Sequence, residues 1–258
     1  MSASVPLLDL RKVSKRFTTS PDLIERVAAK FGFAAAAQTV HAVDQVSFSI
    51  ASGEVIGLVG ESGCGKSTLG RVIAGLHKAT EGEVLFQGQP LNYAPGVRPT
   101  IQMIFQDPFA SLNPRKRVGD AIVEAPIAHG LIAASQAKEQ AAQLLEQVGL
   151  DASYVRRFPH QFSGGQRARI GIARALAVEP TLLVCDEAVA ALDVSIQAQV
   201  LNLFMDLRER LSLTYLFISH DLGVVRHIAD RVVVMYLGRV VEIGQTTELH
   251  DHPNHPYT

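Results

Sequence analysis

Short apolar runs bounded by turn residues recur along the chain and predict buried β-strands. Each run is short enough to suit a strand better than a helix, and glycine or proline stands close to many of the ends. The runs cover residues 7–13, 43–50, 54–59, 83–86, 101–105, 182–185, 214–219 and 231–236. A chain with this many short strands has a sheet at its centre.

Apolar residues spaced three and four positions apart predict helices between several of these strands. In residues 134–148 the apolar positions share one helical face, and the pattern stops at Gly149. The other predicted helices cover residues 68–76, 168–178 and 194–211.

Strands that alternate with helices predict an α/β domain, with a largely parallel sheet and helices on both of its faces. Residues 108–178 interrupt the alternation with a helical pattern alone and predict a second lobe. Residues 18–39, which are polar and then rich in alanine, predict an excursion between two strands.

Composition and charge exclude several classes of protein. Of 258 residues, 47% are hydrophobic, which is enough for a sizeable core. The 24 basic and 25 acidic residues give a net charge of −1, whereas polyanion-binding proteins usually carry a basic excess. Two cysteines cannot form a disulfide framework or a four-thiolate metal site. Because no apolar run nears the roughly 18 residues of a membrane span, and the first residues do not read as a signal peptide, we expect a cytosolic domain.

The residues between 60 and 68 fit a phosphate-binding loop, the P-loop. They read Gly-Glu-Ser-Gly-Cys-Gly-Lys-Ser-Thr and match G-x-x-x-x-G-K-[ST], with an apolar run before and a helical pattern after. The glycines let backbone N–H groups converge on phosphates, the lysine reaches the β- and γ-phosphates, and the serine can bind Mg²⁺. The candidate nucleotide-binding residues are Gly60, Ser62, Gly63, Cys64, Gly65, Lys66, Ser67 and Thr68.

Two adjacent carboxylates end another apolar strand. Asp186 and Glu187 follow residues 182–185, and a strand of this kind delivers its last residues to the edge where such sheets bind ligands. Asp186 would hold Mg²⁺ through water, since Mg²⁺ keeps much of its hydration shell. Glu187 would then act as the general base on an attacking water. Without the P-loop, the same pair would be an ordinary turn at the end of a strand.

A second helix begins with two glycines. Ser163 and Gln166 have the spacing of a capping box, so one interpretation is a simple helix start. That interpretation leaves Gly164 and Gly165 unexplained. Bare N–H groups at a helix N-terminus favour an anion, which predicts a second phosphate-binding helix end.

Taken together, these motifs resemble the ATP-binding cassette (ABC) ATPases over nearly the whole chain. The P-loop corresponds to Walker A, FSGGQ to the family signature and LLVCDE to Walker B. Phe17 takes the place of the aromatic that stacks on adenine, Gln106 that of the Q-loop glutamine, Asp193 lies in the D-loop and His220 is the switch histidine. Gln106 would also approach the metal.

The resemblance implies an α/β fold: a P-loop NTPase core with a mostly parallel sheet, an antiparallel β subdomain and a helical subdomain. The whole chain, 1–258, would be one nucleotide-binding domain. Its core would consist of residues 1–107 and 179–258, and its helical signature subdomain of residues 108–178.

The resemblance also implies ATP and Mg²⁺ as cofactors and a second cassette, identical or paralogous, as a partner. In this family two cassettes pair head to tail, with each ATP between Walker A of one chain and the signature of the other. Ser163, Gly164, Gly165 and Gln166 would then face the partner's nucleotide, and Asp193 would cross the interface.

Several of these residues have simpler interpretations. Phe17 could be a core aromatic, Gln106 a polar residue at a strand end, and His220 a histidine satisfied by its neighbours. Cys64 and Cys185 could be buried and inert. The histidines at 250, 252 and 255 lie in a proline-rich setting that indicates a loosely ordered tail more than a metal site.

Four runs are similar to the peptide and nickel importer branch of the family, at residues 106–115, 157–162, 191–195 and 255–258. They imply a peripheral subunit on the inner face of the cell membrane. It would power import of peptides or similar small solutes through permease subunits and, indirectly, a solute-binding protein. Phe105 and Phe109 are candidates for the permease contact. An exporter cassette, or an ABC ATPase acting on ribosomes or nucleic acid, remains an alternative, although nucleic acid is not expected.

Two departures from the family pattern lie beside the catalytic residues. Ala188 replaces the usual proline after the Walker B acids, and Ala190 replaces the usual serine or threonine. Neither removes a catalytic group, so hydrolysis is still expected. Relatives in this branch also continue past residue 258, often with an iron–sulfur cluster, so the resemblance implies that this extension is missing here.

Overall fold

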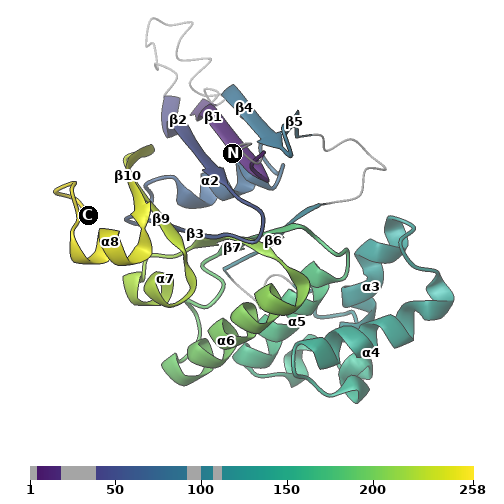
Figure 1. Ribbon diagram of the computed structural model, residues 1–258. Coiled ribbons are helices and arrows are strands. Elements are labelled where there is room, and N and C mark those ends of the chain that lie inside the picture. The colour runs from purple at the N-terminus through teal and green to yellow at the C-terminus, as the bar shows by residue number, and fades with distance from the viewer. Residues whose placement is uncertain (1–4, 19–38, 92–99, 107–111) are drawn as a thin grey trace, which may run out of the picture.

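The computed structural model describes residues 5–18, 39–91, 100–106 and 112–258. It contains two sheets, with helices around the larger one (Figure 1). The smaller sheet is antiparallel, with strand order β2-β1-β4-β5. Its strands are β1 (Leu8–Thr18), β2 (Thr39–Ile50), β4 (Glu81–Phe86) and β5 (Gln89–Pro90).

The larger sheet has strand order β10-β9-β3-β8-β7-β6 and is parallel except at β10, which pairs antiparallel with β9. Its strands are β3 (Val55–Val59), β6 (Ile101–Ile104), β7 (Leu182–Asp186), β8 (Thr214–Ile218), β9 (Arg231–Tyr236) and β10 (Arg239–Gln245). This is the mostly parallel sheet that the sequence predicts. It brings the carboxyl ends of β3, β8, β7 and β6 to one edge.

Helices cover both faces of this sheet. They are α2 (Lys66–Ile73), α3 (Val118–Ala128), α4 (Ala137–Gln147), α5 (Gly164–Leu176), α6 (Val194–Leu211), α7 (Leu222–Ile228) and α8 (Thr246–Asp251). Short 3-10 turns at Ala134–Gln136, Ala152–Arg156 and Pro159–Gln161 connect some of them. None of the helices in the described ranges combines the length and the apolar character needed to cross a membrane.

The core has two main parts, one on each face of the larger sheet. Leu182 and Val184 of β7 pack on the side that holds α2 and the antiparallel sheet. Leu183 and Cys185 of the same strand pack on the side of α3 to α6. Because successive side chains of a strand point to opposite faces, β7 is buried on both. This explains why its sequence is continuously apolar rather than alternating.

Helices α3, α4 and α5 pack against one another, and α5 also packs on α6. They form the teal and green helical group below the antiparallel sheet in Figure 1. Their buried residues belong to the same cluster as one face of the larger sheet. The division of the chain at residues 107/108 and 178/179 stays a prediction.

The described elements agree with most of the predicted ones and differ in several bounds. β1 runs on past residue 13 to Thr18, with a bulge near Lys12, whose φ is 48°, and β2 begins at Thr39, before the predicted 43. The predicted helix at 134–148 begins with a 3-10 turn before α4. β5, β10, α7 and α8 were not predicted. Residues 19–38, and with them most of the predicted excursion, lie outside the described residues.

Candidate nucleotide-binding and catalytic site

The P-loop connects β3 to α2 and is packed tightly against the backbone of other strands. A Cβ on Gly60, whose φ is 151°, would lie 2.2 Å from the carbonyl oxygen of Met235. One on Gly65, whose φ is 108°, would lie 2.1 Å from that of Ala42. Glycine is therefore required at both positions by close approach and by backbone conformation, in addition to the predicted access of phosphates.

Lys66 lies inside this loop with its ammonium held in place. Its Nζ donates hydrogen bonds to the carbonyl oxygens of Gly60 at 2.7 Å and Glu61 at 2.8 Å, and its residue is only 4% exposed. An ammonium has three protons, and the third is donated over 3.9 Å to the sulfur of Cys64, a weak acceptor that a phosphate oxygen could replace. The loop thus positions a cation beside the first turn of α2.

The N-terminus of α2 has no side-chain cap. Its N-cap residue is Gly65, which has no side chain to accept a hydrogen bond from the first N–H groups. The first N–H groups of a helix need partners, and the helix dipole favours negative charge at this end. The P-loop, Lys66 and α2 together therefore form a site suited to a phosphate group.

Ser67 and Asp186 connect this helix to the end of β7. Ser67 Oγ donates to Asp186 Oδ1 at 2.8 Å. Burial raises the pKa of Asp186 above its usual range, although the hydrogen bond from Ser67 opposes the shift. A hydroxyl and a carboxylate are the oxygen ligands that Mg²⁺ takes from a protein when phosphate and water supply the rest. Among the described residues, no group of three His, Cys, Asp or Glu side chains lies together to hold a metal.

Three predicted catalytic residues meet at neighbouring strand ends. Glu187 follows β7, Gln106 follows β6 and His220 follows β8, and these strands are adjacent in the order β8-β7-β6. Glu187 Oε2 accepts a hydrogen bond from Gln106 Nε2 at 2.7 Å, and Oε1 lies 3.1 Å from His220 Nδ1. Both carboxylate oxygens therefore have partners in the single chain.

The backbone of Glu187 is strained. Its φ of 50° lies in the left-handed region, which costs a non-glycine residue about 1–3 kcal/mol. Its N–H donates to the carbonyl oxygen of Ile218 at 3.0 Å, which ties the turn to β8. Ala190 N–H in turn donates to the Glu187 carbonyl oxygen at 3.0 Å. The turn thus holds the Glu187 side chain at the sheet edge.

The signature forms the N-terminus of α5 and contains the predicted capping box. Ser163 Oγ accepts from the N–H of Gln166 at 3.3 Å, and Gln166 Oε1 accepts from the N–H of Ser163 at 3.1 Å. A Cβ on Gly165 would lie 2.4 Å from Ile196 Cγ2 of α6. Gly165 thus has a further reason to be glycine, because the packing of α5 on α6 leaves no room for a side chain, and the predicted anion contact of both glycines stays a prediction.

Gly164 differs from Gly165 because a side chain there has room. A Cβ would make only ordinary contact, at 3.6 Å from Leu192 Cδ2. The neighbours of both glycines thus belong to α6 and the turn before it, and not to the P-loop of the same chain. Asp193 is exposed at the N-cap of α6 and makes no side-chain cap hydrogen bond.

Phe17 lies at the end of β1 and is 39% exposed, so it is not a core aromatic. Lys15 Nζ lies 5.0 Å from the centroid of its ring, and the ring of His77 meets it edge-on at 5.5 Å. Both cysteines are buried, and burial raises the pKa of the Cys185 thiol, which makes that thiol unreactive. Phe105 is exposed, whereas Phe109 lies outside the described residues.

Comparison with known proteins identifies the family. A sequence profile of the ABC transporter family matches residues 43–190, which is more than half of the chain. The chain belongs to the ABC transporter family. The resemblance that the motifs indicate is thereby confirmed for this cassette.

Several ABC proteins are similar to the chain over nearly all of its length. The oligopeptide transport ATP-binding protein AppF of Bacillus subtilis is 53% identical, covering 98% of this chain and 76% of AppF. OppF of the same organism is 51% identical, covering 92% of this chain and 80% of OppF. The glutathione import ATP-binding protein GsiA of Shigella boydii is 48% identical over 98% of this chain, which spans only 40% of GsiA.

Solved ABC structures share the fold. The cassette cbiO1 of Clostridium perfringens, part of the ABC transporter complex cbiONQ, has a TM-score of 0.78 at 25% identity and covers 96% of this chain and 91% of its own. The ATP-binding cassette MJ0796, in a dimeric post-hydrolysis state with ADP and phosphate, has a TM-score of 0.77 at 26% identity and covers 93% and 98%. The predicted fold class is therefore confirmed.

Sequence reasoning missed some of the residues that support this site. The carbonyls of Ala42 and Met235 form the surface on which the P-loop glycines lie. Gly238, in the turn between β9 and β10, donates its N–H to the carbonyl oxygen of Cys64 at 3.0 Å. These contacts use backbone atoms, which leave no signal in side-chain chemistry. In the sequence, only the presence of Gly238 in a turn pointed to its contact with the P-loop.

Proposed function

We propose that this chain is the ATP-hydrolysing subunit of a membrane importer for peptides or similar small solutes. The observation that carries the proposal is the arrangement of Glu187 between Gln106 and His220, beside the Ser67–Asp186 pair and the P-loop. This arrangement supports a base, a metal site and a phosphate-binding cation at one sheet edge. The similarity to AppF and OppF over most of each protein supports peptide import.

In this mechanism the P-loop residues and Lys66 bind the phosphates, with the N-terminus of α2 directed at them. Phe17 stacks on the base. Ser67, Asp186 and Gln106 would hold Mg²⁺, which would supply positive charge that neutralises the phosphates.

Hydrolysis then requires a water in line with the γ-phosphate. Glu187 accepts a proton from this water as the water oxygen bonds to the γ-phosphorus and the bond from that phosphorus to the bridging oxygen of ADP breaks, and His220 stabilises the γ-phosphate. Each oxygen of Glu187 has one partner in the single chain and keeps a second lone pair, so these contacts orient the carboxylate without preventing it from accepting the proton.

The second half of each site comes from another cassette, identical or paralogous. Its Ser163, Gly164, Gly165 and Gln166 contact the nucleotide from the opposite side, and its Asp193 lies at the interface. Two observations support this: Gly164 begins α5 with room beside it, and the similar cassette MJ0796 is a dimer with ADP and phosphate. The assembled subunits lie on the cytoplasmic side of the membrane against the permease, with the exposed Phe105 as one contact.

Reconstitution tests this proposal. The chain is co-purified with candidate permease subunits of a peptide importer and placed in proteoliposomes with a solute-binding protein. We expect ATP-dependent uptake of a labelled peptide, together with phosphate release that peptide and binding protein stimulate. The matched control replaces Lys66 with alanine. Retention on ribosomes or nucleic acid, without association with any permease, would contradict the proposal.

A further inference from the structure

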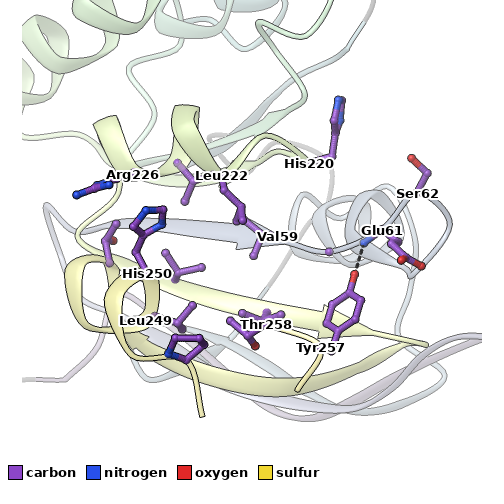
Figure 2. Close-up of a pocket in the computed structure, with 16 residues that line it drawn as sticks. Val59, Glu61, Ser62, His220, Leu222, Arg226, Leu249, His250, Tyr257 and Thr258 are labelled. Atoms are coloured by element: carbon purple, nitrogen blue, oxygen red, sulfur yellow. Dashed lines mark hydrogen bonds between the residues drawn. The ribbon is translucent and has the colours of Figure 1, made fainter. Parts of the chain in front are cut away.

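The segment at 254–258 reaches the P-loop through one tyrosine. Tyr257 lies within the run at 255–258, to which the proposed mechanism gives no role. Its hydroxyl oxygen accepts a hydrogen bond from the backbone N–H of Glu61 at 2.8 Å, drawn as a dashed line in Figure 2. The two residues are far apart in the sequence, so this contact connects the end of the described chain to the nucleotide site.

The contact completes the fixation of a single peptide unit. The carbonyl oxygen of Gly60 and the N–H of Glu61 belong to the same planar unit and point in opposite directions. Lys66 Nζ holds the carbonyl at 2.7 Å, and Tyr257 holds the N–H. The φ of Gly60 is accessible only to glycine, whose backbone is otherwise permissive. The two hydrogen bonds, on opposite sides of this peptide unit, therefore restrict its rotation, which the permissive backbone of glycine would otherwise allow.

Tyr257 is itself held in place from β10 and β9. The carboxylate of Glu242 accepts hydrogen bonds from the N–H groups of Asn254 at 2.8 Å and His255 at 3.1 Å. Contacts from the Thr258 side chain and from these N–H groups lower the pKa of Glu242 to about 2, so the anchor stays ionised near neutral pH. The ring of Tyr257 lies 4.5 Å from that of Tyr236, centroid to centroid.

The ring and the hydroxyl of Tyr257 make different contacts. The ring packs against an apolar cluster that includes Val59, the residue before the P-loop. A cavity of about 620 Å³ lies between the segment and α7, and Figure 2 shows Tyr257 and Glu61 at its margin. The hydroxyl adds the hydrogen bond to the loop itself, so a replacement that removes only the hydroxyl separates the two contacts.

We propose that Tyr257 is a positioning residue for nucleotide binding. It fixes the Glu61 N–H, keeps the Gly60 carbonyl in place and thereby holds the Lys66 ammonium where it receives a phosphate. The inference rests on the proposed function, because it takes ATP as the ligand of Lys66. Glu242 acts through Tyr257 by anchoring the segment.

The test is the replacement Tyr257→Phe in the full chain, which removes the hydroxyl and keeps the ring. We expect the Kd for Mg·ATP to rise about 2- to 10-fold, the effect of one ordinary hydrogen bond. KM should rise in parallel, whereas kcat should stay within about twofold of the parent, because the groups at the ends of β6, β7 and β8 are untouched. The thermal midpoint without nucleotide should stay close to that of the parent.

Tyr236→Phe is the matched control. The Tyr236 ring contacts the same tyrosine, but within the described part of the chain its hydroxyl has no hydrogen-bond partner. The Kd of Tyr236→Phe for Mg·ATP should equal that of the parent. Glu242→Ala should raise this Kd, as Tyr257→Phe does. The Kd of the double variant should not exceed that of the more affected single variant, because both replacements act on one contact.

An unchanged Kd in Tyr257→Phe would overturn the inference, and so would an equal loss of affinity in Tyr236→Phe. Additive effects of the two replacements at 242 and 257 would overturn the role of Glu242. Failure of the proposed function has a different signature: the parent and Lys66→Ala would then bind ATP equally poorly.

Discussion

Oε1 of Glu187 lies 3.1 Å from Nδ1 of His220, which joins the ends of β7 and β8 across the candidate catalytic site. The Glu187 side chain is 14% exposed, and that of His220 is 52% exposed. The carboxylate is thus sheltered at the base of the site, while the imidazole can move toward a ligand. This difference gives the two residues separable effects when they are replaced.

Replacing Glu187 with glutamine keeps the shape of the side chain but removes the proposed base. We expect phosphate release at saturating Mg·ATP to fall about 10²- to 10⁴-fold, the usual contribution of a general base. Equilibrium binding of ATP should persist, since Lys66 and the P-loop are unchanged. Glu146→Gln, an exposed carboxylate on α4, is the control. Hydrolysis at the parental rate would show that Glu187 is not the base.

Replacing His220 with alanine removes the donor that we propose for the γ-phosphate. We expect kcat to fall about 10²-fold, as for the loss of a transition-state donor, with a smaller change in the Kd for ATP. The thermal midpoint should stay near the parental value, because the side chain is half exposed. His227→Ala, at an exposed histidine of α7, serves as the comparison. Loss of ATP binding with an unchanged kcat would contradict this role.

Replacing Ser67 with alanine removes the hydroxyl that contacts Asp186 at 2.8 Å. We expect the Mg²⁺ concentration for half-maximal ATPase activity to rise about 10-fold or more, as is typical when a metal site loses a supporting group. A titration of Mg²⁺ at constant ATP measures this. Ser67→Thr, which restores a hydroxyl, should lie closer to the parent. Identical Mg²⁺ titrations for parent and alanine variant would argue against a metal at this position.

Alanine at Gly65 should damage the P-loop more than alanine at Gly63. A Cβ at Gly65 meets the Ala42 carbonyl oxygen at 2.1 Å, whereas one at Gly63 has nothing within 4 Å. Both residues have positive φ, so Gly63→Ala incurs only left-handed strain of about 1–2 kcal/mol. The free energy of unfolding in urea should fall further for Gly65→Ala. Gly130→Ala, with a φ of 67° and open space away from the site, calibrates the strain. Equal losses at all three positions would exclude a steric effect.

Alanine replacements at the two signature glycines should have different effects, one on stability and the other on assembly. Gly165→Ala places a Cβ 2.4 Å from Ile196 and should lower the thermal midpoint. Gly164→Ala makes only ordinary contact and should leave the monomer stable, with parental ATP binding. In a Glu187→Gln background it should nevertheless weaken the ATP-dependent dimer, measured by light scattering. An undiminished dimer would place the nucleotide contact elsewhere.

Much of the fold follows from local pattern. β9 and α6 have the bounds that the apolar runs and the helical spacing predict, because both are long enough to show their periodicity. β10 was missed because none of its residues is buried at the edge of the sheet. α7 has only seven residues, and its N-cap is Asp221, whose side chain accepts from the N–H groups of Gly223 and Val224.

The site was predictable only in part, for a physical reason. The P-loop is continuous in sequence, so its residue types reveal it. The contacts among Gln106, Glu187 and His220 depend on the strand order β8-β7-β6, which local patterns do not specify. The contact between Glu61 and Tyr257 is even harder to predict from the sequence, because its donor is a backbone N–H, which nearly every residue has.

The two partners of the Glu187 carboxylate make its orientation depend on both neighbouring strands. Gln106 follows β6 and His220 follows β8, so the carboxylate at the end of β7 is held from either side. A displacement of either strand end would therefore turn this carboxylate, and the rate of a reaction that depends on it would report movements of the sheet edge.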